Sequence, residues 1–397
     1  MTGAPKFQPK WVGVFALIAA TTACSAPPRD PATVLAIQTQ ADRYEAEREA
    51  ESEATRQRLI DRGDAIASGR TRDSTFDILL LSGGADWGAF GAGFLAAWNE
   101  LGDAAAYPMP EFDVISGIST GALIGSYIVD QQPASYSGIE AFYRDTSSDW
   151  VTFNGLPGLL PGSLAVLDNT GVREQVAANV DAALIEALRE ARDDDRMLMI
   201  GATDLDFGQL RYFEMGDVAT VHADPKERLV SILMAATAIP GLFPPEKIDG
   251  YLYGDGGAVQ GAPGIQPRNM PLFRQAWADR FGDRPFPPVR LWWIFNNQLE
   301  LEPEAVELSW FSVLFRSYQT ISQTSFKAPL QANLLMAEST KRTGQGDIEV
   351  RWVAIPSDFV PPEDARPFDP AVTNRLADIG REVAAQPGGG WRTDLPD

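Results

Sequence analysis

A serine lies between two glycines in Gly117-Ile-Ser-Thr-Gly121, directly after an apolar, β-prone run that begins at Phe112. An apolar run from Ala122 to Val129 follows and predicts a helix. A G-x-S-x-G pattern between a strand and a helix is typical of a sharp turn that holds a serine in a strained conformation, where a Cβ at either glycine would collide with a neighbouring element. The pattern alone also occurs by chance, but this context makes Ser119 the candidate nucleophile, at the positive end of a helix.

A serine hydroxyl is a poor nucleophile until a base takes its proton. The only histidine, His222, lies in a polar segment that predicts a surface connection, so a Ser–His–Asp triad is disfavoured. The other candidate is Asp255, which ends an apolar strand-like run and precedes two glycines that allow a tight turn and a close approach of another backbone. If it packs beside Ser119 and is partly desolvated, its pKa should rise toward the range of a useful base. The structural alternative for Asp255 is an Asx turn that bonds its own backbone.

A glycine-rich segment, Ser82-Gly-Gly-Ala-Asp-Trp-Gly-Ala-Phe-Gly-Ala-Gly93, follows the first predicted strand and leads into a helix. A phosphate loop would need Gly-Lys-Ser/Thr at the helix start, and no lysine is there. A dinucleotide site would need its glycines earlier, within the turn itself. We therefore expect an oxyanion hole beside the nucleophile. Its backbone N–H donors would be those of Gly83, Gly84 and Ala85.

Strand-like and helical segments alternate along the chain, which predicts an α/β fold with a mostly parallel sheet covered on both faces. Apolar runs predict strands at 77–81, 112–115, 197–203, 209–213, 247–253, 289–296 and 348–355. Helices are expected at 229–236, 310–341 and 370–385. The charged stretch at 33–69 favours a helix but lacks an apolar stripe, so we expect a solvated stalk there.

The N-terminus is typical of an export signal. Lys6 and Lys10 precede an apolar segment, Trp11 to Ala20, that is too short to span a bilayer.

The net charge of −21 argues against nucleic acid as a partner and against attraction to anionic membranes, so contact with lipid would be apolar or through an anchor.

Small residues lead from the apolar segment to Cys24, the only cysteine, in a pattern that resembles a bacterial lipoprotein box with Thr21 in place of the usual leucine. We expect residues 1–23 to be a signal peptide and Cys24 to carry lipid that tethers the chain to a membrane. Ser25 favours the outer membrane by the same resemblance. The alternative is ordinary cleavage near Ala26 and a periplasmic or secreted protein.

The glycine-rich segment, Gly117-Ile-Ser-Thr-Gly121 and Asp255-Gly-Gly257 occur in an order that resembles the patatin-like phospholipase family, and Ala235 to Pro245 is similar to the family's segment before the aspartate. The similarity covers roughly residues 76–299. It implies a three-layer α/β/α sandwich, a Ser119–Asp255 dyad and an oxyanion loop that contains Gly83 and Gly84. It also implies phospholipase A-like or lysophospholipase-like hydrolysis of lipid acyl esters through an acyl-enzyme, without a metal or other cofactor.

Two positions depart from the family pattern. Ala85 replaces the third loop glycine, and an alanine there keeps its N–H as a donor if its φ is negative. Trp87 stands where the family usually has Arg or Lys, which favours neutral acyl esters or lysolipids. These departures leave a second hypothesis open, a catalytically inactive surface lipoprotein that binds lipid or a protein partner. A serine peptidase or a thioesterase on the same dyad is a third.

The expected organisation has four parts. Residues 1–23 form the signal peptide, and residues 24–75 form a tether and charged helical stalk. Residues 76–300 form the catalytic domain. Residues 301–397 add helices and a strand that pack on the same domain.

Overall fold

A computed structural model describes residues 29–39, 41–155, 163–300, 310–362 and 365–396, together with residues 303, 305, 306 and 308. The expected signal peptide and Cys24 lie outside these residues. Within the described ranges, no helix has both the length and the apolar character that a bilayer crossing requires.

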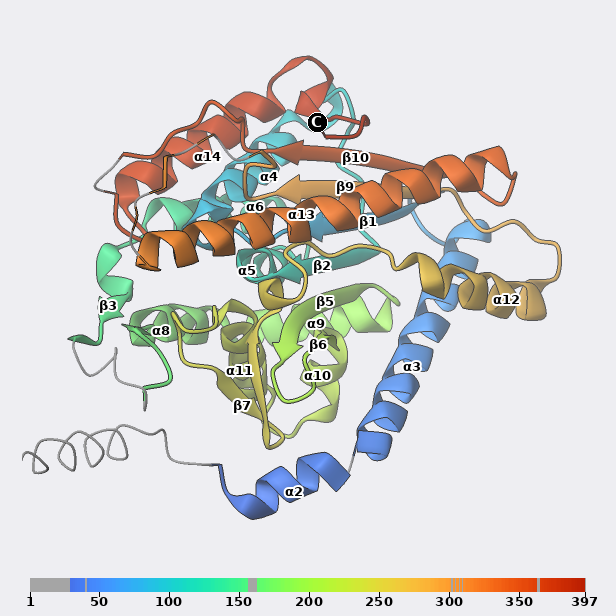
Figure 1. Cartoon of the computed structure of the whole chain (residues 1–397). Helices are drawn as coiled ribbons and strands as arrows, with labels where there is room; N and C mark the ends of the chain where they lie inside the picture. The colour runs from blue at the N-terminus through green and yellow to red at the C-terminus, as the bar shows by residue number, and fades with distance from the viewer. Residues whose placement is uncertain are drawn as a thin grey trace, which may run out of the picture.

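Eight strands of the described chain form one mixed sheet at the centre of the molecule (Figure 1). Strands β10, β9, β1, β2 and β5 are parallel in that spatial order, β8 and β7 continue the sheet in antiparallel pairing, and β6 pairs antiparallel with β5. This arrangement confirms the expected mostly parallel sheet. The strands are β1 (Phe76–Leu81), β2 (Val114–Ile118), β5 (Met197–Asp204), β6 (Gln209–Glu214), β7 (Glu246–Ile248), β8 (Tyr251–Asp255), β9 (Val289–Phe295) and β10 (Ile348–Ala354).

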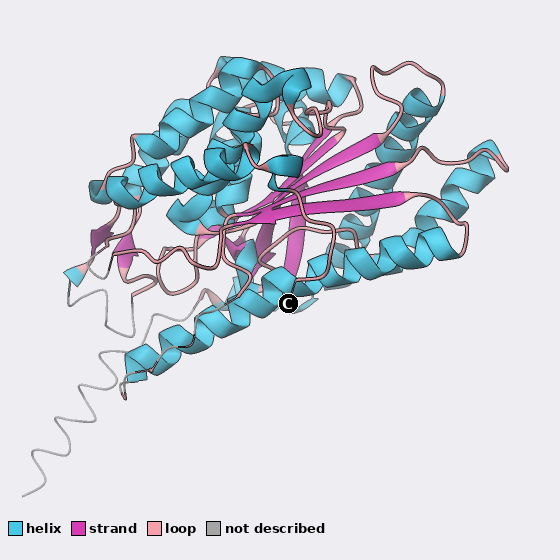
Figure 2. Ribbon diagram, turned by 90° about the horizontal axis from the view of Figure 1, so that it is seen from above, coloured by secondary structure: helices cyan, strands magenta, loops and turns pink. Residues whose placement is uncertain are grey.

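Strand β1 explains why helices lie on both faces of the sheet (Figure 2). All six of its residues are buried. Leu79 and Leu81 pack against one group of helices, whereas Ile78 and Leu80 pack against another. Because successive side chains of a strand point to opposite faces, a continuous apolar run must be covered twice. The resulting three-layer α/β/α sandwich agrees with the expected fold class.

The first group of helices comprises α4 (Gly88–Leu101), α5 (Thr120–Tyr127), α6 (Pro133–Arg144), α8 (Thr170–Asn179), α9 (Ala182–Asp193), α10 (Met215–Val221), α11 (Pro225–Thr237) and α14 (Pro370–Ala384). The second group contains α3 (Ala41–Ala67) and the long α13 (Trp310–Arg342). Two shorter helices, α2 (Pro31–Thr39) and α12 (Met270–Phe281), and a two-stranded sheet of β3 (Thr152–Phe153) and β4 (Leu167–Asp168) complete the described α-helices and strands, and short 3-10 turns connect some of them.

The single strand expected at 247–253 is a hairpin in the structure. Its turn lies at Asp249 and Gly250, which have φ values of 53° and 91°. Asp-Gly is a strong hairpin signal because both central positions of the favoured turn require positive φ. The reversal makes β8 antiparallel to β5, so that Asp255 lies opposite Ala202 of β5.

Helix α3 forms where a helix was expected, but the expectation of a solvated stalk is wrong. Tyr44, Ile60 and Ile66 are buried against the rest of the domain. The Tyr44 hydroxyl donates a hydrogen bond to the carboxylate of Asp204, and its ring stacks on Phe207 with a centroid separation of 3.9 Å. The helix is therefore an integral part of the sandwich.

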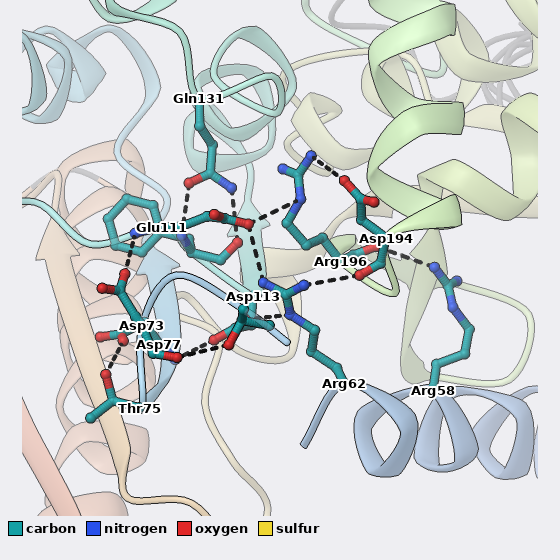
Figure 3. A network of polar contacts seen from close by, with 12 residues as sticks. Arg58, Arg62, Asp73, Thr75, Asp77, Glu111, Asp113, Gln131, Asp194 and Arg196 are labelled. Atoms are coloured by element: carbon teal, nitrogen blue, oxygen red, sulfur yellow. Dashed lines mark hydrogen bonds and ion pairs between the residues drawn. The ribbon is translucent and has the colours of Figure 1, made fainter. Parts of the chain in front are cut away.

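Two arginines of α3 fasten the helix to the rest of the domain, and Figure 3 shows Arg62 near its middle and Arg58 at its right. The Nε of buried Arg62 donates to Asp113 at 2.6 Å, and its NH2 lies 3.1 Å from Glu111. Arg58 pairs with Glu214 at 2.7 Å. Burial raises the pKa of Asp113 to about 6 although Arg62 lowers it. These ion pairs help to attach a helix that has no apolar stripe. The charged sequence therefore did not indicate that the helix packs on the domain.

Candidate active site

Ser119 occupies the turn between β2 and α5 with φ 54° and ψ −125°, a conformation that costs a non-glycine residue free energy. The flanking glycines are needed for the steric reason expected from the sequence. A Cβ on Gly117 would lie 2.2 Å from the carbonyl oxygen of Gly121, and a Cβ on Gly121 would lie 2.3 Å from that of Leu81. Neither position has room for any other residue, so the turn holds Ser119 in its strained conformation.

Asp255 is held at the end of β8 by its neighbours. Its N–H donates to the carbonyl of Ala238 at 2.8 Å, and its own carbonyl accepts the Thr203 hydroxyl at 2.9 Å. The N–H of Gly257 donates to Oδ1 of the Asp255 carboxylate at 2.7 Å. The run that contains Ala238 is the segment that resembles the one before the family's aspartate. The local turn expected for Asp255 is therefore present, but it leaves the carboxylate with capacity for a second partner.

The hydroxyl of Ser119 lies near enough to this carboxyl to lower its pKa as a hydrogen-bond partner. Strand β5 lies between β2, which precedes Ser119, and β8, which carries Asp255, so the two residues come from strands two places apart. Desolvation raises the pKa of Asp255 to about 6, while hydrogen bonds from Ser119 and from the Gly257 backbone lower it in part. Such a carboxyl is ionised at neutral pH and is a much better base than an exposed aspartate. His222 is exposed at the end of α10.

The glycine loop passes directly beside the serine, but its first expected donor is occupied. A Cβ on Gly83 would lie 3.2 Å from Cβ of Ser119. The N–H of Gly83 donates to the carbonyl of Gly261 at 2.8 Å, so the expectation that Gly83 contributes to an oxyanion hole is wrong in this structure. The N–H groups of Gly84 and Ala85 have no acceptor among the described residues, and their role stays a prediction.

Ala85 has a φ of +52°, so the condition of a negative φ that was attached to its donor role is not met, although its backbone N–H is still present as a donor. The left-handed conformation costs an alanine about 1–2 kcal/mol, whereas a glycine adopts it without penalty. The short 3-10 turn that Ala85 begins is secured by the C-terminal part of the chain. Oδ2 of Asp86 accepts the Phe368 N–H at 2.9 Å, and the ring of Trp87 meets Phe359 edge-on with centroids 5.5 Å apart. Two aromatic side chains therefore lie beside the loop, at the position where the family usually has an Arg or Lys.

Two buried side chains near the site are not apparent from sequence motifs. Thr203 bonds the backbone of Asp255, and Asn296 contacts both ends of the glycine loop. The available signal for Asn296 is its position, since it is a polar residue directly after the apolar strand β9.

Comparisons with known proteins found similarity to one protein family over part of the chain. Residues 79–264 match the family model of patatin-like phospholipases. A cGAMP-activated phospholipase from Pseudomonas aeruginosa is 27% identical over 194 residues, which are 48% of this chain and 55% of the relative. The chain thus matches only about half the length of that relative. The crystal structure of VipD from Legionella pneumophila covers 78% of this chain and 65% of its own, with 11% identity and a TM-score of 0.32.

Proposed function

Because residues 79–264 form a patatin-like phospholipase domain, which implies lipid acyl hydrolase activity, we propose that this protein cleaves acyl esters of lipids with a Ser119–Asp255 dyad. The observation that carries the proposal is the Ser119 hydroxyl beside the buried carboxyl of Asp255, whose pKa it lowers as a hydrogen-bond partner. A nucleophile and a base within hydrogen-bond reach are the basic requirement of covalent acyl transfer.

The proposed reaction has two halves. Oγ of Ser119 attacks the ester carbonyl while Asp255 takes the hydroxyl proton, and the resulting oxyanion is held by the N–H groups of Gly84 and Ala85. Collapse of the tetrahedral intermediate breaks the ester bond, and Asp255 gives its proton to the leaving alcohol. Water then attacks the acyl-enzyme while Asp255 takes one of its protons; the bond from the acyl carbon to Oγ of Ser119 breaks, and Asp255 returns the proton to Ser119 as the fatty acid leaves.

Turnover of p-nitrophenyl esters tests the dyad. We expect Ser119→Ala and Asp255→Asn to lose nearly all activity, because each removes one partner of the proton transfer. Asp249→Asn is a matched control, since this carboxylate lies on the exposed turn at the other end of the same hairpin. The wild-type kcat/KM should fall as the pH drops through about 6, where Asp255 takes up a proton. Full rates in both dyad variants would reject the proposal.

The substrate class is the finer part of the proposal. Trp87 offers an aromatic face beside the loop and no positive charge, which supports neutral acyl esters or lysolipids over substrates recognised by a phosphate. Rates on a monoacylglycerol, lysophosphatidylcholine and phosphatidylglycerol would test this order. Trp87→Arg should shift the preference toward phosphatidylglycerol, and an unchanged order would count against this role of Trp87.

We further propose that the protein is exported and tethered to a bacterial membrane through lipid on Cys24. The support is the sequence pattern of residues 1–24 alone. An intact mass of the membrane-extracted protein that equals the chain from Cys24 plus acyl groups would agree, whereas the mass of a chain cleaved near Ala26 would contradict it.

A further inference from the structure

We propose that Asn296 is a positioning residue for the oxyanion turn, an inference that rests on the proposed acyl hydrolase function. Asn296 directly follows β9 and is completely buried. Strand β9 pairs with β1, and the glycine loop begins where β1 ends. The side chain of Asn296 therefore lies beneath the loop that supplies the predicted donors.

Asn296 bonds the loop at both of its ends. Its Nδ2 donates to the carbonyl of Ser82 at 2.9 Å, and its Oδ1 accepts the N–H of Gly91 at 3.0 Å. Its backbone N–H also donates to Oγ of Ser82 at 2.8 Å, and that hydroxyl donates to the carbonyl of Gly83. Asn296 thus links the end of β1 to the first turn of α4. Through the Ser82 hydroxyl, it also holds the carbonyl of Gly83, which precedes the turn.

The backbone of Asn296 also determines how the turn lies. A Cβ on Gly84 would be only 1.9 Å from the carbonyl oxygen of Asn296 and 2.8 Å from its Cβ. Gly84 is therefore pressed against Asn296 with no space between them. The N–H groups of Gly84 and Ala85 are consequently held in a fixed direction while they have no acceptor among the described residues. Donors that are oriented before the reaction stabilise a developing oxyanion without reorganisation.

Only a side-chain amide meets both requirements at this position. The Ser82 carbonyl needs a donor and the Gly91 N–H needs an acceptor, and an asparagine presents one of each on adjacent atoms. An ionised aspartate would turn an acceptor toward the Ser82 carbonyl, and a leucine would fill the space and bond neither group. Both changes should let the turn move, and a displacement of about 1 Å at an active site can lower the rate about 100-fold.

The test compares Asn296→Leu with a matched variant of Gln131, which bonds the chain just before β2 begins and so lies away from the end of β2 that carries Ser119. Gln131 uses the same pair of bonds, because its amide accepts the N–H of Phe112 at 2.7 Å and donates to the Phe112 carbonyl at 2.8 Å (Figure 3). Gln131→Met removes these two bonds as Asn296→Leu removes its two. For both variants we would measure kcat and KM on a p-nitrophenyl ester and the affinity for an alkyl trifluoromethyl ketone, which forms a tetrahedral adduct with serine.

We expect Asn296→Leu to lower kcat about 100-fold with little change in KM, and to weaken the ketone by a similar factor. Gln131→Met should keep the wild-type kcat and ketone affinity. A wild-type kcat in Asn296→Leu, or an equal loss of kcat in both variants, would overturn the inference. If Asn296→Leu does not fold, Ser82→Ala decides, because it removes the hydroxyl that joins Asn296 to Gly83. An unchanged kcat in Ser82→Ala would then overturn it.

Ser119→Ala separates this inference from the function on which it rests. If Ser119→Ala has the same kcat as the wild type, the proposed hydrolase function is rejected, and the role of Asn296 is rejected with it. If Ser119→Ala has a much lower kcat than the wild type while Asn296→Leu keeps the wild-type kcat, only the role of Asn296 is rejected.

Discussion

Asp255→Asn should abolish turnover and at the same time stabilise the fold. Asp255 is only 4% exposed, and burial raises its pKa to about 6 from an ordinary value of 3.8. The folded state therefore holds the proton more tightly than the unfolded state does. At a pH above both values, the wild type must ionise this carboxyl inside the protein, and the neutral amide of the variant avoids that cost. The amide oxygen can still accept the Gly257 N–H.

The size of the effect follows from the two pKa values. Each pKa unit corresponds to about 1.4 kcal/mol, so the variant should gain about 3 kcal/mol in free energy of unfolding at pH 8. At pH 5 the folded wild type is mostly protonated while the unfolded chain is still mostly ionised, and the gain falls to about 1.6 kcal/mol. Below the unfolded pKa the gain disappears. The advantage of the variant is thus largest above pH 6 and shrinks as the pH falls.

Urea unfolding of the wild type and Asp255→Asn at pH 8 and pH 5 measures both values, provided the slopes agree. Asp249→Asn serves as a control of opposite sign, because the hydrogen bond from Arg228 lowers the pKa of Asp249 and its replacement should cost stability at pH 8. An Asp255→Asn variant that is less stable than the wild type at pH 8, or whose advantage is the same at both pH values, would refute the reasoning.

Three further substitutions test separate parts of the structure. Ala85→Gly should stabilise the protein by about 1 kcal/mol and keep turnover, because glycine adopts a positive φ without strain. A loss of stability in urea unfolding would contradict the claim that Ala85 is strained. Gly121→Ala should abolish soluble expression or activity, since its Cβ would lie 2.3 Å from the Leu81 carbonyl; an active variant would refute this steric argument. Arg62→Leu should lower the free energy of unfolding by about 3–5 kcal/mol at pH 8, because it leaves the buried carboxylate of Asp113 without a cation. The loss should be smaller at pH 5, where Asp113 takes up a proton. Equal losses at both pH values would exclude this cause.

The turn at Ser119 could be predicted because its chemistry is local. Two glycines, an apolar strand and an apolar helix within about twenty residues specify the strained turn, and the structure has no room for other residues at Gly117 and Gly121. The parallel order of the sheet follows from the alternation of strands and helices for the same reason. Asp255 and Ser119 are 136 positions apart (255 minus 119), so no local pattern pairs them, and only the family resemblance implied that they form a dyad.

Other features depend on contacts that sequence patterns do not encode. The occupied N–H of Gly83 is set by the position of Gly261, which lies far along the chain. The positive φ of Ala85 accompanies the tight packing of the preceding Gly84 against Asn296. The hairpin at Asp249 and Gly250 was predictable in principle, because the Asp-Gly pair was present between two apolar runs.

The position of α3 also determines where the folding unit begins. A shortened protein starting at Phe76 would retain every strand and the proposed dyad, yet it would leave the carboxylates of Asp113 and Glu214 without the arginines that neutralise them. It would also expose the surface that Tyr44 covers beside Asp204, the residue that follows Thr203 in β5. The smallest autonomous fragment should therefore begin ahead of Tyr44, and the charged helix should be retained in any trimmed form made for crystallisation.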